Sequence, residues 1–60
     1  MDPDETLRQL RGAITDYRQA IDPGKKLYAA DRVVDHAEAI DHWLVNGGFP
    51  PAAWNQARNK

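Results

Sequence analysis

Two breaks in helical propensity divide this chain, and they constrain its fold more than any other feature of the sequence. One is Asp22-Pro23-Gly24, and the other runs from Gly47-Gly48 to Pro50-Pro51. Proline cannot continue a helix because it lacks a backbone N–H, and glycine readily takes the left-handed conformation that ends one. The intervals between the breaks are therefore expected to be helices, and the short first link makes the long helices antiparallel.

The first interval carries a helix start signal and an apolar stripe. Asp2 is placed to be an N-cap, with Pro3 at the first helical position and Glu5 where a capping box needs an acid. Gly12 lowers helix stability, and we interpret it as permitting the close approach of another element. Apolar residues recur at spacings of three and four, as in a heptad pattern. These are Leu7, Leu10, Ile14, Tyr17 and Ile21.

The second interval repeats this pattern. Asp22 is placed to cap a helix that has Pro23 at its first position. The period-two alternation of a strand is absent from the sequence, so we expect an all-α fold. The prediction is a single domain over 1–60, with helices over 3–21 and 23–46 and a short helix over 51–58 that folds back. The second stripe consists of Ala30, Val33, Ala37, Ile40 and Leu44, widened by Leu27, Val34 and Trp43.

The amount of apolar surface predicts self-association. Sixty residues without cysteine cannot be reinforced by a disulfide or a thiolate zinc site. Two broad apolar faces on so short a hairpin cannot both be covered within one chain. We therefore expect two antiparallel hairpins to pair as a helical-bundle homodimer, or as a larger homo-oligomer.

Charged residues form two stripes of opposite sign. Such edges can face each other within the hairpin or between subunits, or they can be solvated faces that contribute little. A nucleic-acid-binding regulator is the alternative function, but the net charge of −1 and the lack of interleaved aromatics make nucleic acid an unfavoured partner. The two stripes are Arg8, Arg11 and Arg18, and Asp31, Asp35, Glu38 and His42; Lys25 and Lys26 would join the first in binding nucleic acid.

Catalytic and metal chemistry find little support. The chain has no serine, no cysteine and no phosphate-binding glycine loop, so we predict neither an enzyme nor a cofactor. Asp35, Glu38 and His42 share a helix face but would leave a metal open to solvent, and no metal site is predicted. The acidic start is unlike a signal peptide, and no apolar run reaches about 18 residues, so a cytoplasmic location without membrane contact is expected.

The aromatic residues near the C-terminal break are the strongest candidates for partner contacts. Trp43, Phe49 and Trp54 either form a small core that holds the tail or stay exposed as an anchor for a partner. The predicted interaction residues combine this group with the first stripe. They are Trp43, Leu44, Phe49, Trp54, Leu7, Leu10, Ile14 and Tyr17.

The segment from Ala39 to Trp54 resembles a C-terminal signature of short uncharacterised proteins from actinobacteria and their phages, of the mycobacteriophage type. Those proteins carry an acidic residue and Trp-Leu before Gly-Gly-Phe, and then Pro-Ala-Ala-Trp, after a charged helix. This chain has Pro50 where a leucine is usual. The resemblance implies an intracellular protein from a phage genome that modifies host functions by binding, and it assigns no catalytic residues.

Overall fold

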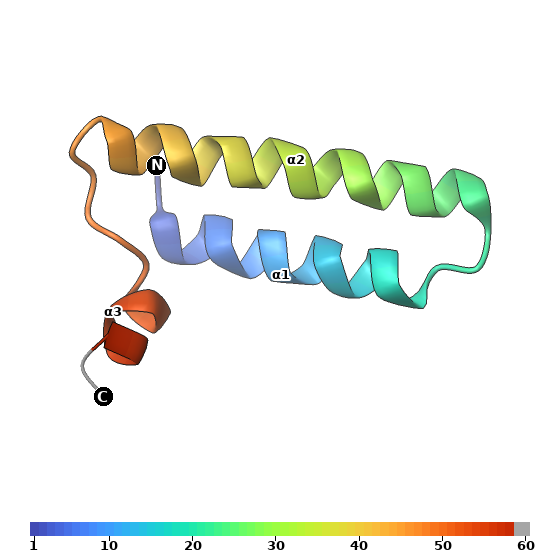
Figure 1. Cartoon of the computed structure of the whole chain (residues 1–60), viewed down its shortest axis with the longest axis horizontal. Coiled ribbons are helices and arrows are strands. Elements are labelled where there is room, and N and C mark those ends of the chain that lie inside the picture. Colours follow the sequence, from blue (N-terminus) through green and yellow to red (C-terminus); the bar gives the residue numbers. More distant parts are fainter. Residues whose placement is uncertain (59–60) are drawn as a thin grey trace.

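The computed structural model describes residues 1–58, with side chains as far as Asn55, and every regular element in that range is a helix. The helices are α1 (Pro3–Gln19), α2 (Pro23–Val45) and α3 (Ala52–Arg58). α1 and α2 run antiparallel side by side, and α3 lies beyond the N-terminal end of α1 (Figure 1). The molecule measures 38 × 25 × 13 Å, and it is thin in one direction because the two long helices form a single layer.

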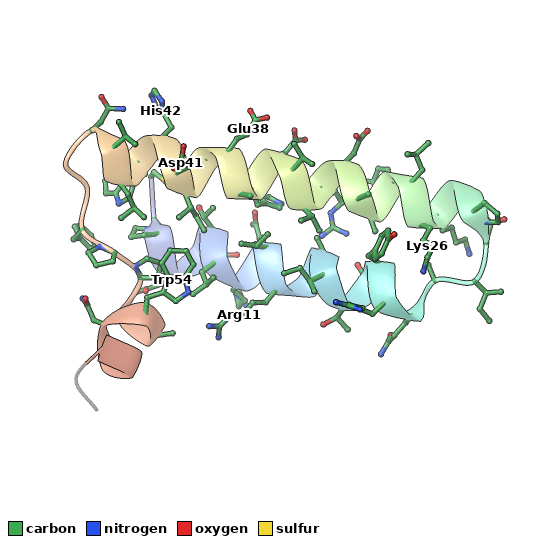
Figure 2. The ribbon with its side chains drawn as sticks, in the orientation of Figure 1. Arg11, Lys26, Glu38, Asp41, His42 and Trp54 are labelled. Carbon is green, nitrogen blue, oxygen red and sulfur yellow. The ribbon has the colours of Figure 1, made fainter. Side chains whose placement is uncertain are left out.

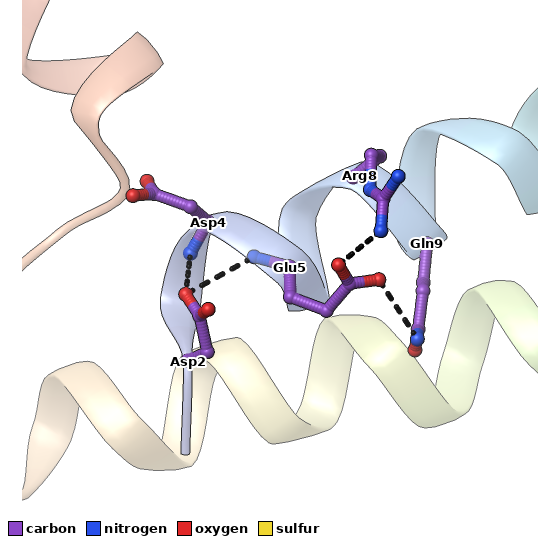
Figure 3. A network of polar contacts seen from close by, with 5 residues as sticks. All are labelled: Asp2, Asp4, Glu5, Arg8 and Gln9. Atoms are coloured by element: carbon purple, nitrogen blue, oxygen red, sulfur yellow. Dashed lines mark hydrogen bonds and ion pairs between the residues drawn. The ribbon is translucent and has the colours of Figure 1, made fainter.

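The start of α1 agrees with the sequence in part. One Asp2 carboxylate oxygen accepts the N–H groups of Asp4 (3.0 Å) and Glu5 (3.2 Å), so the predicted N-cap is confirmed. The predicted capping box is wrong, because both Glu5 carboxylate oxygens accept from side chains in the next turn, those of Arg8 and Gln9 (Figure 3). Glu5 therefore stabilises α1 through side-chain pairs one turn apart.

The link between the long helices is longer than expected, because α1 ends early. α1 ends at Gln19, two residues before the expected Ile21, and Ala20 has extended backbone angles. Asp22 must also be extended, because it precedes Pro23 and caps α2 by accepting the Lys25 N–H (3.0 Å). Ile21 thus lies in the turn, almost fully exposed, and does not extend the apolar stripe.

The end of α2 is set by its two glycines. The helix stops at Val45, one residue before the expected end, and Gly47 has a φ of 91° in the left-handed region. The Gly47 N–H donates to the Leu44 carbonyl (3.1 Å), and the Gly48 N–H donates to the Trp43 carbonyl (2.8 Å). These two bonds make a Schellman motif, so the predicted glycine stop is confirmed.

The contact between α1 and α2 includes small side chains. Ala13 and Ala29 are almost completely buried, although neither belongs to the predicted stripes, and they are joined by Leu7 and Ile40. Because these alanines take up part of the buried contact, stripe residues such as Ile14, Tyr17 and Val34 stay exposed. Gly12 plays no part in this contact, since a Cβ there would meet nothing within 4 Å; the interpretation of Gly12 as a close-contact glycine was wrong.

Two glycine substitutions are expected to change stability in opposite directions. Gly48→Ala should lower the free energy of unfolding by about 1–3 kcal/mol, because the new methyl group would overlap the Trp43 indole. Gly12→Ala should raise it by up to about 1 kcal/mol, because alanine favours the helix and has free space. Urea unfolding followed by circular dichroism measures both; equal effects of the two substitutions would contradict the packing of Trp43 on Gly48.

Candidate interaction surfaces

The chain reversal after α2 folds back onto Trp43. Its indole Nε1 donates to the Phe49 carbonyl (2.8 Å), and the two rings meet edge to face with centroids 5.7 Å apart at 83°. The indole also occupies the space that a side chain at position 48 would need. Trp43 is therefore half-buried under its own tail, whereas 65% of Phe49 remains exposed.

The start of α3 is capped by a residue from α1. Pro51 is fully buried and precedes the helix, and its carbonyl accepts the N–H groups of Trp54 (3.0 Å) and Asn55 (3.2 Å). Proline has no side-chain acceptor, and the Ala52 N–H donates instead to the Asp4 carboxylate (2.8 Å). A carboxylate at this position also interacts favourably with the partial positive charge at the N-terminus of the helix. The sequence signals for α1 gave no indication of this second role of Asp4.

Trp54 lies at the same end of the molecule. Its half-buried side chain extends from α3 toward the first turns of α1 (Figure 2). Leu7 and Leu10 belong to those turns, and they are buried and half-buried, while Leu44 is half-buried on α2. The structure thus divides the predicted aromatic group: Trp43 and Trp54 hold the tail, and Phe49 is the member that remains largely available to a partner.

An apolar groove runs along one side of the α1–α2 layer. We define it by the residues that line it, which are Ile14, Tyr17, Arg18, Ala30, Val33 and Val34. Its large apolar side chains are well exposed, at 40% for Ile14, 39% for Tyr17 and 53% for Val34. Its apolar residues belong to the two predicted stripes and their widening, and each of them is at least partly exposed. The groove is an uncovered apolar surface of the kind that marks interaction sites.

The charged stripes do not face each other within the hairpin. The ion pair between the long helices joins Asp16 on α1 to Arg32 on α2 (3.0 Å), with the opposite assignment of charges from that expected. Figure 2 shows Arg11 and Glu38 pointing away from each other at the two outer edges of the layer. Of the alternatives for the two stripes, pairing inside one chain is therefore not the arrangement found in the hairpin.

Two of the five basic residues of the nucleic-acid alternative make contacts within the chain. Lys26 is half-buried, its ammonium donates to the carbonyls of Tyr17 (3.0 Å) and Ala20 (3.4 Å), and it lies 4.4 Å from the centre of the Tyr17 ring. It therefore caps the end of α1. Arg8 is paired with Glu5. Two of the five residues are thus engaged within the chain, and this weakens the case for a phosphate-binding stripe.

Metal binding and membrane insertion are considered for the described part of the chain. No three His, Asp or Glu residues there come together as metal ligands, and Glu38 and His42 point outward from the edge of the layer formed by α2 (Figure 2). Across residues 1–58, none of the helices is both long and apolar enough to cross a bilayer.

Comparison of the chain with models of protein families, with curated proteins and with solved structures found no match. The candidate functional sites of the chain are therefore the two surfaces described above, the aromatic tail and the apolar groove. Of these, the groove exposes more large apolar side chains, whereas the tail exposes mainly Phe49.

Removing the Asp4 carboxylate should release α3. We expect Asp4→Ala to lower the free energy of unfolding by about 1 kcal/mol, the usual effect of losing an N-cap, and to expose Trp54 to water. The measurements are hydrogen exchange at the Ala52 amide and tryptophan fluorescence. The control is Asp35→Ala, at an exposed position in the middle of α2. Unchanged exchange at Ala52 in Asp4→Ala would contradict the cap.

Two adjacent lysines should behave differently. Lys26→Ala removes the bonds to the last carbonyls of α1, and we expect it to lower the free energy of unfolding by about 1–2 kcal/mol. Lys25→Ala serves as the control and should change it by less than about 0.5 kcal/mol, because its side chain is exposed. Thermal unfolding of both variants provides the comparison, and equal losses of stability would argue against a structural role for Lys26.

Proposed function

We propose that this chain is a small non-enzymatic interaction protein that works as a homodimer or larger homo-oligomer and binds partners through apolar helix surfaces. The observation that carries the proposal is the uncovered groove over Ile14, Tyr17 and Val34. A partner that covers these exposed apolar side chains removes them from water, and this stabilises the complex by about 25 cal/mol for each Å² of apolar surface.

The total exposed surface supports the same proposal. A monomeric protein of 6.8 kDa is expected to expose about 4,000 Å². This chain exposes 4620 Å², roughly 600 Å² more than that average. A chain that exposes this much more surface than its mass predicts is suited to assembly.

The aromatic tail supports a role beyond self-association. Phe49 is exposed beside the half-buried Trp43, and exposed aromatics held by a rigid neighbour are typical anchors for a second protein. The resemblance of the segment around them to short phage proteins favours a host protein as that partner and an intracellular site of action. In this proposal the groove serves assembly, and the tail is the surface left for the host partner.

Charge placed in the groove should prevent assembly. Size-exclusion chromatography with light scattering is expected to give a dimer or larger species at micromolar concentration. Val34→Asp should shift this species toward monomer, because a desolvated carboxylate would oppose the interface. The matched control is Tyr28→Asp, since Tyr28 is 68% exposed and lines the opposite side of the hairpin.

The outcome of the control decides between the two sides of the layer. Tyr28→Asp should leave the assembly state unchanged, and circular dichroism should show that both variants remain helical. A wild-type chain that is monomeric at these concentrations would overturn the assembly proposal. A dimer that survives Val34→Asp but not Tyr28→Asp would move the interface to the opposite side.

A further inference from the structure

We infer that the groove is covered by a second copy of this chain, related by a twofold axis parallel to the long helices, so that α1 of each copy lies over α2 of the other. This inference rests on the proposed function and adds the identity, orientation and register of the partner. It follows from the charges that border the groove, their spacing along the helices and the single-layer architecture.

The two sides of the groove carry the same spacing with opposite charge. On α1, Ile14 lies between Arg11 and Arg18, and on α2, Val34 lies between Asp31 and Glu38. In both triplets the charges stand three residues before and four residues after the apolar residue, which places all three on one helix face. All four charged side chains are exposed, and Ile14 and Val34 both line the groove. The hairpin therefore presents a basic edge and an acidic edge of matching length.

The register of the two edges follows from the contacts inside the hairpin. Asp16 pairs with Arg32, so the ends of these two side chains stand at the same height along the antiparallel helices. Ile14 and Val34 line the same groove and therefore lie near each other in height. Because the charges flank these two residues at the same spacings, Arg18 stands nearer to Asp31 in height, and Arg11 nearer to Glu38.

A twofold axis parallel to the helices keeps every residue at its height and exchanges the two sides. α1 of one copy then covers α2 of the other, and Ile14 packs on Val34 of the second copy. Arg11 faces Glu38 and Arg18 faces Asp31 along both outer edges of the bundle. Flanking pairs of this kind select partner and orientation in helical bundles.

The other face-to-face arrangement is opposed by the same charges. A twofold axis perpendicular to the helices would place α1 over α1 and α2 over α2. Because the apolar residue lies near the middle of each triplet, Arg11 would meet Arg18, and Asp31 would meet Glu38 of the second copy. Like charges at these positions disfavour that arrangement. The opposite side of the layer is less suited to a second copy, because its lining includes Asp16, Asp22, Lys25 and Arg32.

The experiment exchanges the two edges. Variant A carries Arg11→Glu and Arg18→Glu, and variant B carries Asp31→Lys and Glu38→Lys. Each homodimer then has four repulsive contacts in place of four attractive ones, and we expect its dissociation constant to rise at least about tenfold. In an equimolar mixture of A and B, every pair is attractive again. Native mass spectrometry and sedimentation equilibrium should therefore show the A–B heterodimer as the dominant species.

A mixture of the same net charges serves as the control. Variant C carries Arg8→Glu and Lys25→Glu, which changes the charge as much as variant A does but leaves the edge formed by Arg11 and Arg18 intact. The C–B mixture should form fewer heterodimers than the A–B mixture, because only one of its two edges is attractive. Equal recovery in both mixtures would reduce the effect to net charge and overturn the inference.

The remaining outcomes separate this inference from the proposed function. If the wild-type chain is a dimer and both A and B dimerise as tightly as wild type, the twofold arrangement is overturned while self-association stands. The same holds if A and B are monomers that do not recombine. If the wild-type chain is a monomer, the assembly proposal fails as well. Recovery of the A–B heterodimer would also show that both variants are folded.

Discussion

The narrow contact between α1 and α2 is the constraint on which the rest of the structure depends. Ala13 and Ala29 are almost completely buried in it, and small side chains let two helices approach closely. The larger apolar residues of the stripes must then lie at the margins of the contact. Ile14, Tyr17 and Val34 consequently border a groove that a single layer of two helices cannot cover. The same rotation turns Arg11 and Glu38 to the outer edges (Figure 2).

The tail after α2 is held to the long helices mainly by polar contacts. A Schellman motif at Gly47 and Gly48 reverses the chain, and the Trp43 indole fills the space above Gly48 while it donates to the Phe49 carbonyl. Asp4 then caps α3 across the molecule. The first turn of α1, the last turn of α2 and the start of α3 are joined at this end. Phe49 remains exposed in this arrangement. It belongs to the tail and not to the lining of the groove, so the tail and the groove are distinct surfaces.

Much of the helical framework could be predicted from local signals. Asp2 and Asp22 cap the helices that follow them, and the glycines end α2, because capping and left-handed backbone depend on residues within one turn. The end of α1 was misplaced, since the requirements of the next helix start reach back into the turn. Periodicity selected apolar residues correctly as a class. It could not give the rotation of each helix about its own axis. A stripe that includes Ala30, Val33 and Val34 is wide enough to be compatible with several rotations.

The sequence by itself determined that the chain is helical and that apolar and charged residues form long stripes, because both follow from spacings of three and four residues. It also determined where α2 ends, because proline and glycine stop a helix. Only the tertiary structure decided which part of each stripe is buried. That choice depends on how each helix is rotated about its axis, and the burial of Ala13 and Ala29, which lie outside both predicted stripes, shows the result. It also decided that Asp4 caps α3 and that Lys26 caps α1, because both contacts join elements that the local pattern treats as independent.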